Sequence, residues 1–411
     1  MTDIQKSMKI IFYLSLVAFV LGSLGELPLF IPGVHVYLSD LTGILLIIYQ
    51  LINFPETIRF VRRDKISGGF LLFILACFIS LLLTPIRLTL LELGISAMYP
   101  VRLLIYFGYY LTVSLFIKSK KIQPNKLIKL LMYAGLTLAI FGWLQYFLYP
   151  NLRNLFYLGW DPHLGRIFST FLDPNYFGLL TVLTLVISFC MHTSIISHPE
   201  FISGSSPKKM LKQVQHDNFI YWVVRLFLLI TLLFTYSRSS YLAMFGVSLF
   251  YSLVKRKFYY FILLVLILVG GAFLLPRTEG IGVQLERTFS FTERVKNWQE
   301  AVTIFAKNPI TGVGFNTLRY ARRQYDIPID DWQNNHAAAG VDNSFLFVLA
   351  TTGLLGLFLF IKLLVRIYLH GGLLVRATLV AISIHSLFTN SFFFPWILYW
   401  FWIVVAIDRK D

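Results

Sequence analysis

Residues 219–254 read FIYWVVRLFLLITLLFTYSRSSYLAMFGVSLFYSLV, two apolar runs joined only by the polar stretch SRSS at 237–240. The two runs form either one long helix or two membrane-spanning helices with a tight turn between them. Basic residues separate these interpretations, because Lys and Arg collect on cytoplasmic loops. Two spans keep the basic cluster at 255–257 on the same side as the other basic clusters of the chain. We therefore predict two spans, with Arg238 at the non-cytoplasmic face.

The composition extends this interpretation to the whole chain. Of the 411 residues, 57% are apolar and only 14% are charged, whereas a soluble domain carries about 25% charged residues. Lipid accommodates such a surface, because apolar side chains can face it all around a helix. The sequence predicts an all-α integral membrane protein with about 12 transmembrane helices. The predicted spans lie at about 9–30, 35–54, 67–85, 100–118, 127–148, 171–193, 219–236, 239–254, 257–275, 343–365, 373–389 and 392–407.

The basic clusters predict the orientation. Apart from the N-terminus and one long loop, they follow even-numbered spans, at 59–65, 118–126, 208–212, 255–257, 362–366 and 409–410. Both termini are then cytoplasmic. This asymmetry also explains the net charge of +16 without a nucleic-acid partner. Cys77 and Cys190 lie inside apolar runs, which argues against a disulfide framework or a thiolate metal site.

Three regions follow from the spans. Residues 1–275 hold spans one to nine, with a polar, compositionally foreign cytoplasmic insertion at about 198–217. Residues 276–342 form a large non-cytoplasmic loop with short helices, and residues 343–411 hold spans ten to twelve. The loop carries eight basic and eight acidic residues, so the positive-inside rule does not explain its arginines. Thr292 is the predicted N-cap of a helix at about 293–306, with Trp298, Ala301, Val302 and Phe305 on its apolar face.

Four charged residues lie at the non-cytoplasmic membrane edge in this topology: Arg166, Arg238, Arg294 and Asp342. Charges there are costly unless they are used. Guanidinium groups form paired hydrogen bonds with phosphate oxygens, so three arginines indicate a phosphate or diphosphate ligand. A carboxylate beside them could accept a proton from an attacking sugar hydroxyl. Each arginine alone could equally contact lipid headgroups or form a loop salt bridge.

An ordered set of motifs surrounds these residues. It comprises FLDPNYFG at 171–178, YSRSSYL at 236–242, Arg294-x-x-x-Trp298-x-x-Ala301, NPITGVGFNT at 308–317 and DNSFLFVLATTGLLG at 342–356. Over about residues 160–365 the set resembles the O-antigen ligase and O-antigen polymerase superfamily of bacterial membrane glycosyltransferases. No single motif is specific for this superfamily, whereas the order of the motifs and their placement around one long loop are specific together.

The resemblance implies a GT-C-like fold in the bacterial inner membrane and a periplasmic location for the loop. It implies glycosyl transfer from an undecaprenyl-diphosphate-linked glycan donor to a glycan or lipid A-core acceptor, without a metal or other cofactor. A chain-length regulator is a possible partner of such a polymerase. Arg166, Arg238 and Arg294 would bind the diphosphate. Gly312 and Gly314 would form a tight turn that lets the loop approach the membrane.

The chain departs from the ligases at one position. They typically have His-Asn where this chain has Asp342-Asn343, and that histidine is their proposed base; the nearest histidine here is His336, six residues earlier. Asp-Asn is more similar to the polymerases, so we favour O-antigen or exopolysaccharide polymerase over lipid A-core ligase. Either Asp342 or His336 is the candidate base.

A transporter or flippase of lipid-linked oligosaccharides is the alternative from another class. Twelve spans with buried charges fit it, but transporters usually contain two related halves and a midplane site. This chain has no evident internal repeat, and its polar residues gather at one face. Asp40, Arg102 and His385 lie within or at the ends of predicted spans, where we expect them to be paired inside the bundle.

Overall fold

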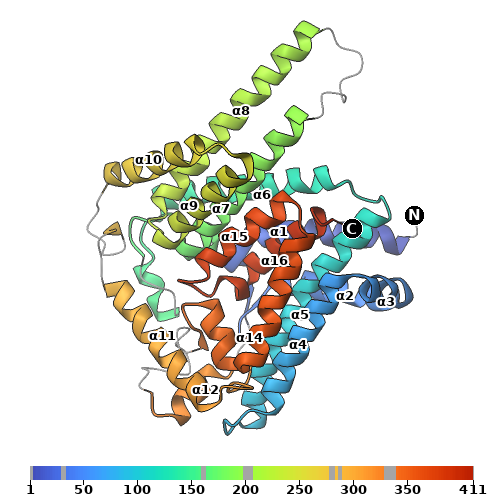
Figure 1. The fold of residues 1–411 in the computed structure, drawn as a ribbon, viewed down its shortest axis with the longest axis vertical. Coiled ribbons are helices and arrows are strands. Elements are labelled where there is room, and N and C mark those ends of the chain that lie inside the picture. Colours follow the sequence, from blue (N-terminus) through green and yellow to red (C-terminus); the bar gives the residue numbers. More distant parts are fainter. Residues whose placement is uncertain are drawn as a thin grey trace.

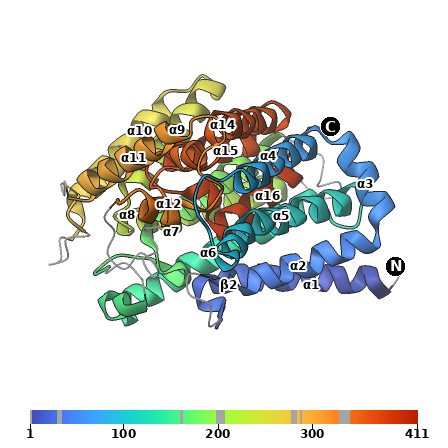
Figure 2. The same ribbon diagram turned by 90° about the horizontal axis from the view of Figure 1, so that it is seen from below.

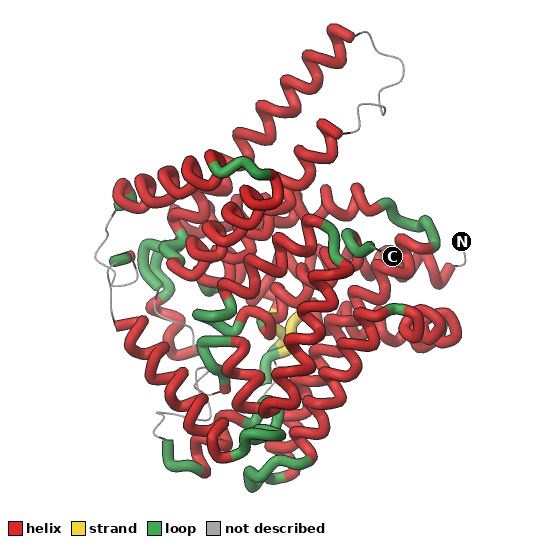
Figure 3. The backbone as a smooth tube through the Cα atoms, in the orientation of Figure 1, coloured by secondary structure: helices red, strands yellow, loops and turns green. Residues whose placement is uncertain are grey.

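A computed structural model of the chain describes residues 3–28, 34–158, 163–197, 207–276, 283–285, 289–327 and 339–410. Within these residues the protein is mainly helical (Figure 3). Its one sheet there consists of two short antiparallel strands, β1 (Glu26–Leu27) and β2 (Val36–Tyr37). The structure therefore confirms the predicted all-α class.

Six helices of the described residues are long and apolar enough to cross a membrane. They are α1 (Asp3–Leu21), α4 (Lys65–Leu82), α5 (Leu90–Lys118), α6 (Pro124–Leu148), α7 (Pro174–Ser197) and α14 (Ser344–His370). A bent pair, α2 (Leu38–Ile52) and α3 (Phe54–Arg63), makes a seventh candidate, with 97° between its halves.

Shorter helices account for the other predicted spans. They are the apolar part of α8 (Pro207–Phe234), α9 (Arg238–Lys255), α10 (Tyr259–Leu274), α15 (Leu373–His385) and α16 (Pro395–Ile407). Each predicted span thus lies on a helix, and many large apolar side chains on these helices are exposed, as lipid contact requires. The chain has the architecture of a multi-pass membrane protein, while the count of twelve spans stays a prediction.

The structure separates α8 from α9. The helical conformation stops after Phe234 and resumes at Arg238, so one continuous helix over 219–254 is excluded. Residues 207–217 of the predicted insertion form the first turns of α8, which projects from the body of the protein (Figure 1). The rest of that insertion, 198–206, lies outside the described residues.

The long loop contains two described helices, α11 (Phe289–Lys307) and α12 (Leu318–Gln324). Both lie at one end of the bundle, and the two chain termini lie toward the other (Figures 1 and 2). Two details of the predicted loop helix are wrong. It begins at Phe289 rather than after Thr292, and Val302 is exposed while Ile304 is buried, because the face that packs on α14 contains Ala301 and Ile304.

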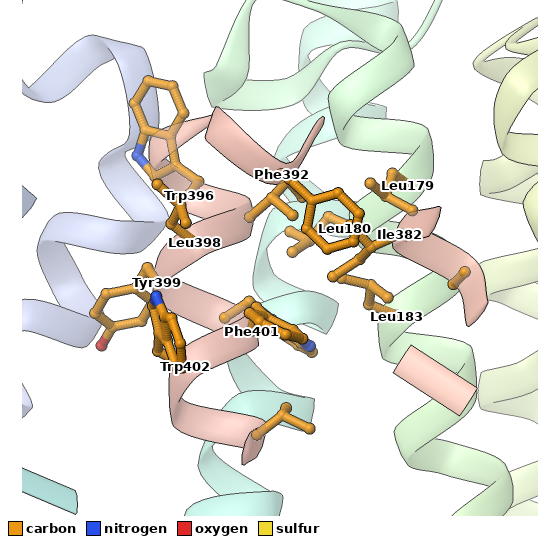
Figure 4. Close-up of a cluster of buried hydrophobic side chains, with 14 of the residues drawn as sticks. Leu179, Leu180, Leu183, Ile382, Phe392, Trp396, Leu398, Tyr399, Phe401 and Trp402 are labelled. Carbon is orange, nitrogen blue, oxygen red and sulfur yellow. The ribbon is translucent and has the colours of Figure 1, made fainter. Parts of the chain in front are cut away.

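The core surrounds α16, which is buried along its whole length. A helix that is apolar on every side suits either a protein core or lipid, and here neighbouring helices enclose it. Figure 4 shows Phe392 among Leu179, Leu180 and Leu183 of α7 and Ile382 of α15, while Trp396 and Tyr399 of α16 lie on the opposite side of that helix, where Tyr399 contacts α1. This packing fixes the segment between α15 and α16, residues 386–394, which lies beneath the candidate site.

Candidate functional site

Asp342 lies directly before α14, where the long loop returns to the bundle. Helix α11 holds its backbone at two points: the Asp342 N–H donates to Asn297 Oδ1 at 2.8 Å, and Trp298 Nε1 donates to the Asp342 carbonyl at 3.1 Å. The carboxylate side chain is 53% exposed. A fixed backbone with an exposed carboxylate suits a group that must meet a substrate.

Asn343 has a structural role. It is the N-cap of α14, and its Oδ1 accepts hydrogen bonds from the backbone N–H groups of Phe345 and Leu346. Such a cap stabilises a helix by about 1 kcal/mol. Its Nδ2 also donates to the carbonyl of Leu387, 3.2 Å away. In the Asp342-Asn343 pair, the second residue therefore fixes the helix start and the first presents its carboxylate.

Arg294 lies close to this carboxylate, and Arg238 lies close to Arg294. Arg294, on the same face of α11 as Asn297 and Trp298, has its Nε 4.0 Å from Asp342 Oδ2. Arg238 is the first residue of α9, is half-buried, and donates from Nη1 to the carbonyl of Leu285 at 3.3 Å. Burial lowers the pKa of Arg238, and the charge of nearby Arg294 lowers it further. The structure thus brings two guanidinium groups and one carboxylate together.

Arg166 occupies a different environment. It is buried, with 3% of its surface exposed, and its Nε donates to the carbonyl of Thr235 at 2.8 Å. The adjacent Ile167 N–H donates to the carbonyl of Phe234, 3.0 Å away. The segment around Arg166 therefore binds the α8–α9 turn that carries Arg238. In this structure Arg166 supports that turn, whereas Arg238 and Arg294 are the more accessible arginines.

A buried polar network underlies the α8–α9 turn, and His385 is at its centre. His385 Nε2 lies 3.0 Å from Ser239 Oγ and 3.2 Å from Ser240 Oγ. Its Nδ1 lies 2.6 Å from Ser391 Oγ and 2.7 Å from Thr389 Oγ1. Every partner is buried, and buried polar groups are stable when they are hydrogen-bonded in this way.

The same segment holds both halves of the site. Ser344 N–H donates to the carbonyl of Ser386 at 2.9 Å, next to the Asn343 contact with Leu387. Residues 386–387 thus anchor the start of α14, while His385 anchors the turn that bears Arg238. Ser237 and Ser240 also bond to Asn175, so the FLDPNYFG and YSRSSYL motifs meet in this network.

The glycines of the NPITGVG segment insert into a break in α14. Gly353 has non-helical φ and ψ angles, so the helix loses backbone hydrogen bonds there. The loop replaces them: Val313 and Gly314 N–H groups donate to the carbonyls of Ala350 and Thr351 at 3.1 and 2.9 Å. In return, Leu354 N–H donates to the carbonyl of Pro309 at 2.9 Å.

The loop glycines fit this contact closely. Gly312 has φ +70° and Gly314 has φ +105°, values that side-chain-bearing residues rarely adopt. A Cβ on Gly312 would lie 2.3 Å from the carbonyl carbon of Thr351. The backbone approach beside the membrane helix therefore requires glycine at this position.

One buried arginine of the loop had no specific signal in the sequence. Arg322, on α12, is 1% exposed, and its Nε lies 3.2 Å from Glu300 Oε2 on α11. Its Nη1 donates to the carbonyl of Gly340 at 3.1 Å. Burial lowers the pKa of Arg322, while Glu300 and Asp342 raise it. Arg322 ties α11, α12 and the approach to Asp342 together; the only sequence signal was a basic residue in an otherwise neutral loop.

Other predicted positions lie apart from this cluster. Asp40 and Arg102 pair with each other through two hydrogen bonds of 3.1 and 2.9 Å, as expected for charges inside a bundle. His336 lies outside the described residues. Within the described ranges, no group of three or more His, Cys, Asp or Glu residues is arranged to hold a metal ion.

Residues 223–361 match the family model for O-antigen ligase. The matched region includes Arg238, Arg294, Asp342 and both loop glycines, while Arg166 precedes it. This finding confirms the resemblance to the O-antigen ligase and polymerase superfamily that the motifs indicated. No curated protein matches the chain.

Proposed function

We propose that this chain, which carries an O-antigen ligase domain over residues 223–361, is a glycosyltransferase that uses a lipid-diphosphate-linked glycan donor. The domain is that of a membrane enzyme family with ligase or polymerase activity. The observation that carries the finer proposal is the cluster of Arg238, Arg294 and Asp342 at one end of the bundle.

The two accessible arginines suit the diphosphate of the donor. Two like charges close together repel each other, and an anion between them removes that repulsion. Guanidinium groups also form two parallel hydrogen bonds with phosphate oxygens. When the glycosidic bond breaks, negative charge builds up on the leaving diphosphate, and preorganised cations stabilise that charge. Arg238 and Arg294 would hold the donor and lower the barrier by this effect.

Asp342 is the proposed general base. The acceptor hydroxyl oxygen attacks the anomeric carbon of the donor sugar, the bond from that carbon to the phosphate oxygen breaks, and the lipid diphosphate leaves with the bonding electrons. The hydroxyl proton passes to the Asp342 carboxylate. The exposed carboxylate, the fixed backbone and the nearby Arg294 support this role. His336 stays the alternative base.

The other predicted residues would hold the elements of the site in place. Arg166 would keep the α8–α9 turn in place, since it contacts the carbonyl of Thr235. Gly312 and Gly314 would hold the long loop against α14. An error of 1 Å in the placement of catalytic groups can reduce a rate by about 100-fold.

For the reaction type we favour a polymerase of O-antigen or exopolysaccharide repeat units over a lipid A-core ligase. The Asp342-Asn343 pair supports this choice, because it resembles the residue pair of the polymerases. The donor would be undecaprenyl-diphosphate-linked, and the reaction would take place on the periplasmic side of the bacterial inner membrane. A chain-length regulator is then a natural partner. The O-antigen ligase domain favours the enzyme over the transporter.

Reconstitution tests the proposal. The purified chain is placed in liposomes with an undecaprenyl-diphosphate-linked repeat unit, with and without a lipid A-core acceptor. A ladder of longer lipid-linked glycans without the acceptor supports the polymerase, and a single transfer that requires the acceptor supports the ligase. Donor movement between leaflets with no new glycosidic bond would refute the enzyme proposal and favour the transporter.

A further inference from the structure

A cavity of about 560 Å³ lies at the opposite end of the bundle from the candidate site, near the chain termini. Its volume is in the range of small-molecule sites. The charged groups that line it are Arg63, Lys65, Lys118, Arg409, Lys410 and Asp64. We call it the basic cavity, and in the predicted topology it opens on the cytoplasmic side.

The positive charge exceeds what the protein itself neutralises. Five Lys and Arg side chains face one carboxylate. Helices α3, α5, α14 and α16 line the cavity with their last residues, and α4 lines it with its first. A helix C-terminus carries about half a negative charge, so four of them supply about two. The N-terminus of α4 adds about half a positive charge. With Asp64 and with Asp408, whose charge acts on Lys410, a charge of roughly one and a half remains positive.

The carboxylate is already engaged. Asp64 Oδ1 lies 3.3 Å from Arg409 Nη1, and Asp64 Oδ2 accepts hydrogen bonds from Tyr110 and from the N–H of Ser67 at 2.8 Å each. By contrast, Arg63, Lys65 and Lys118 form no ion pair within the part of the chain that the structure describes. These cations are therefore the groups that an anion would meet.

The surroundings add positive charge and apolar surface. A second, more open cavity of about 360 Å³ shares Arg63, Asp64 and Lys65 and adds Arg62 and Arg366. Apolar residues, including Phe60 and Ile407, line the rest of the first cavity together with Ser114 and His370. Helix α3, which turns 97° from α2, begins at the exposed Phe54 and carries arginines in its second half. Such an amphipathic helix lies at a membrane surface, at headgroup level.

We propose that the basic cavity binds a phosphate-bearing anion, either the headgroup of an anionic phospholipid or free phosphate. Both present the same tetrahedral oxygens to Lys and Arg. The site would be separate from the transfer chemistry, since it lies at the other end of the bundle and uses none of the candidate site residues. It would fix the ends of α3, α5 and α16 relative to one another.

Binding to the purified full-length chain tests the proposal. Calorimetric titrations in neutral detergent use dihexanoyl phosphatidylglycerol, dihexanoyl phosphatidylcholine and inorganic phosphate as separate probes. We expect saturable binding of phosphatidylglycerol, weaker binding of phosphatidylcholine, and loss of binding at high salt. Binding of phosphatidylglycerol alone identifies a lipid headgroup site, and comparable binding of inorganic phosphate identifies a free-phosphate site. Equal binding of both lipids, or none of any probe, overturns the proposal.

A matched pair of triple variants separates the cavity from general surface charge. Arg63→Gln with Lys65→Gln and Lys118→Gln should weaken binding at least ten-fold. Arg59→Gln with Lys129→Gln and Lys257→Gln removes the same charges from exposed positions outside the cavity and should change it less than two-fold. Equal weakening by both overturns the proposal. If the first triple variant misfolds, Lys118→Gln alone is compared with Lys129→Gln, and equal affinities count against the cavity.

Discussion

Gly312 and Gly353 meet where the long loop inserts into the break of α14, and both have a left-handed backbone, with φ of +70° and +66°. A Cβ on Gly312 would lie 2.3 Å from the Thr351 carbonyl carbon, and one on Gly353 would lie 2.2 Å from the Ile310 carbonyl oxygen. Each glycine thus admits the backbone of the other segment. The loop and the broken helix complete each other's hydrogen bonds.

Alanine at either glycine should therefore destabilise the protein. The left-handed conformation alone costs an alanine about 1–2 kcal/mol, and the overlap with backbone atoms, which cannot move aside, adds to this. We expect Gly312→Ala and Gly353→Ala to lower the unfolding temperature in detergent and to abolish glycan product. Gly270→Ala is the control, because nothing lies within 4 Å of its added Cβ and its backbone is helical. An unchanged unfolding temperature in Gly312→Ala would argue against this contact.

The arginines should divide into two kinds. Arg238→Ala and Arg294→Ala should reduce transfer by about 10²–10³-fold, the effect of removing one preorganised donor, with little change in unfolding temperature. Arg238→Lys should also be poor, because an ammonium cannot form the paired contact. Arg166→Ala should lower both transfer and the unfolding temperature, since Arg166 is buried and contacts the carbonyl of Thr235.

Arg153→Ala serves as the control for these variants, because Arg153 is exposed on the same predicted face and its Nε donates to Asn151 Oδ1 two residues away, at 3.0 Å. It should keep wild-type product. Normal transfer by both Arg238→Ala and Arg294→Ala would refute the diphosphate role. If Arg238→Ala instead unfolds the protein as Arg166→Ala does, then Arg238 is structural as well.

His385 should act as a positioning residue. It connects the turn of Arg238 to residues 389–391, next to the contact that anchors α14. His385→Ala leaves buried hydroxyls without their partner, which costs about 1–3 kcal/mol, and should lower product and stability together. His385→Gln keeps a polar group near Ser239 and should recover part of the product. Equal loss in both variants, with an unchanged unfolding temperature, would instead point to a direct chemical role.

The fold was predictable because the sequence patterns that determine its helices are local. Continuous apolar runs place the helices, and the SRSS stretch marks the break between α8 and α9. The broken α14 was not predictable, because Gly353 lies in an otherwise apolar run and its new hydrogen-bond partners lie about 40 residues away in the loop. The exposed Val302 was missed for a similar reason: the neighbour that selects the buried face of α11 is distant in sequence.

The candidate site was predictable only in part, because only some of its features depend on local patterns in the sequence. The topology rule puts Arg238, Arg294 and Asp342 on one side, but only the fold shows that Arg294 is 4.0 Å from Asp342. The sequence also could not distinguish the buried Arg166 from the more accessible Arg238. His385 and Arg322 depend on contacts between distant elements, which no spacing in the sequence encodes.

Cysteine labelling tests the predicted orientation. In a variant without Cys77 and Cys190, Gln299→Cys in α11 and Gln123→Cys between α5 and α6 both place a thiol at an exposed position. A membrane-impermeant maleimide should label position 299 from outside the inner membrane and position 123 only after permeabilisation, because the basic clusters put the loop outside. The reverse pattern would invert the topology and move the candidate site to the cytoplasmic face.

Asp342 provides the sharpest test of the chemistry. Its backbone is fixed by Asn297 and Trp298, so Asp342→Asn should keep the fold and most hydrogen bonds while losing the ability to take a proton. General-base catalysis typically contributes about 10²–10⁴-fold to a rate, and we expect a loss of that size in polymerised product. Asp342→Glu should recover some of it, because the carboxylate returns at a slightly different distance.

His336→Ala is the matched comparison, since His336 is the other candidate base. It should keep most of the product under the same conditions. If His336→Ala instead loses the product while Asp342→Asn keeps it, then His336 is the base and Asp342 only orients Arg294. That outcome would also remove the support that Asp342-Asn343 gives to a polymerase, because the chain would then use histidine as the ligases are proposed to do.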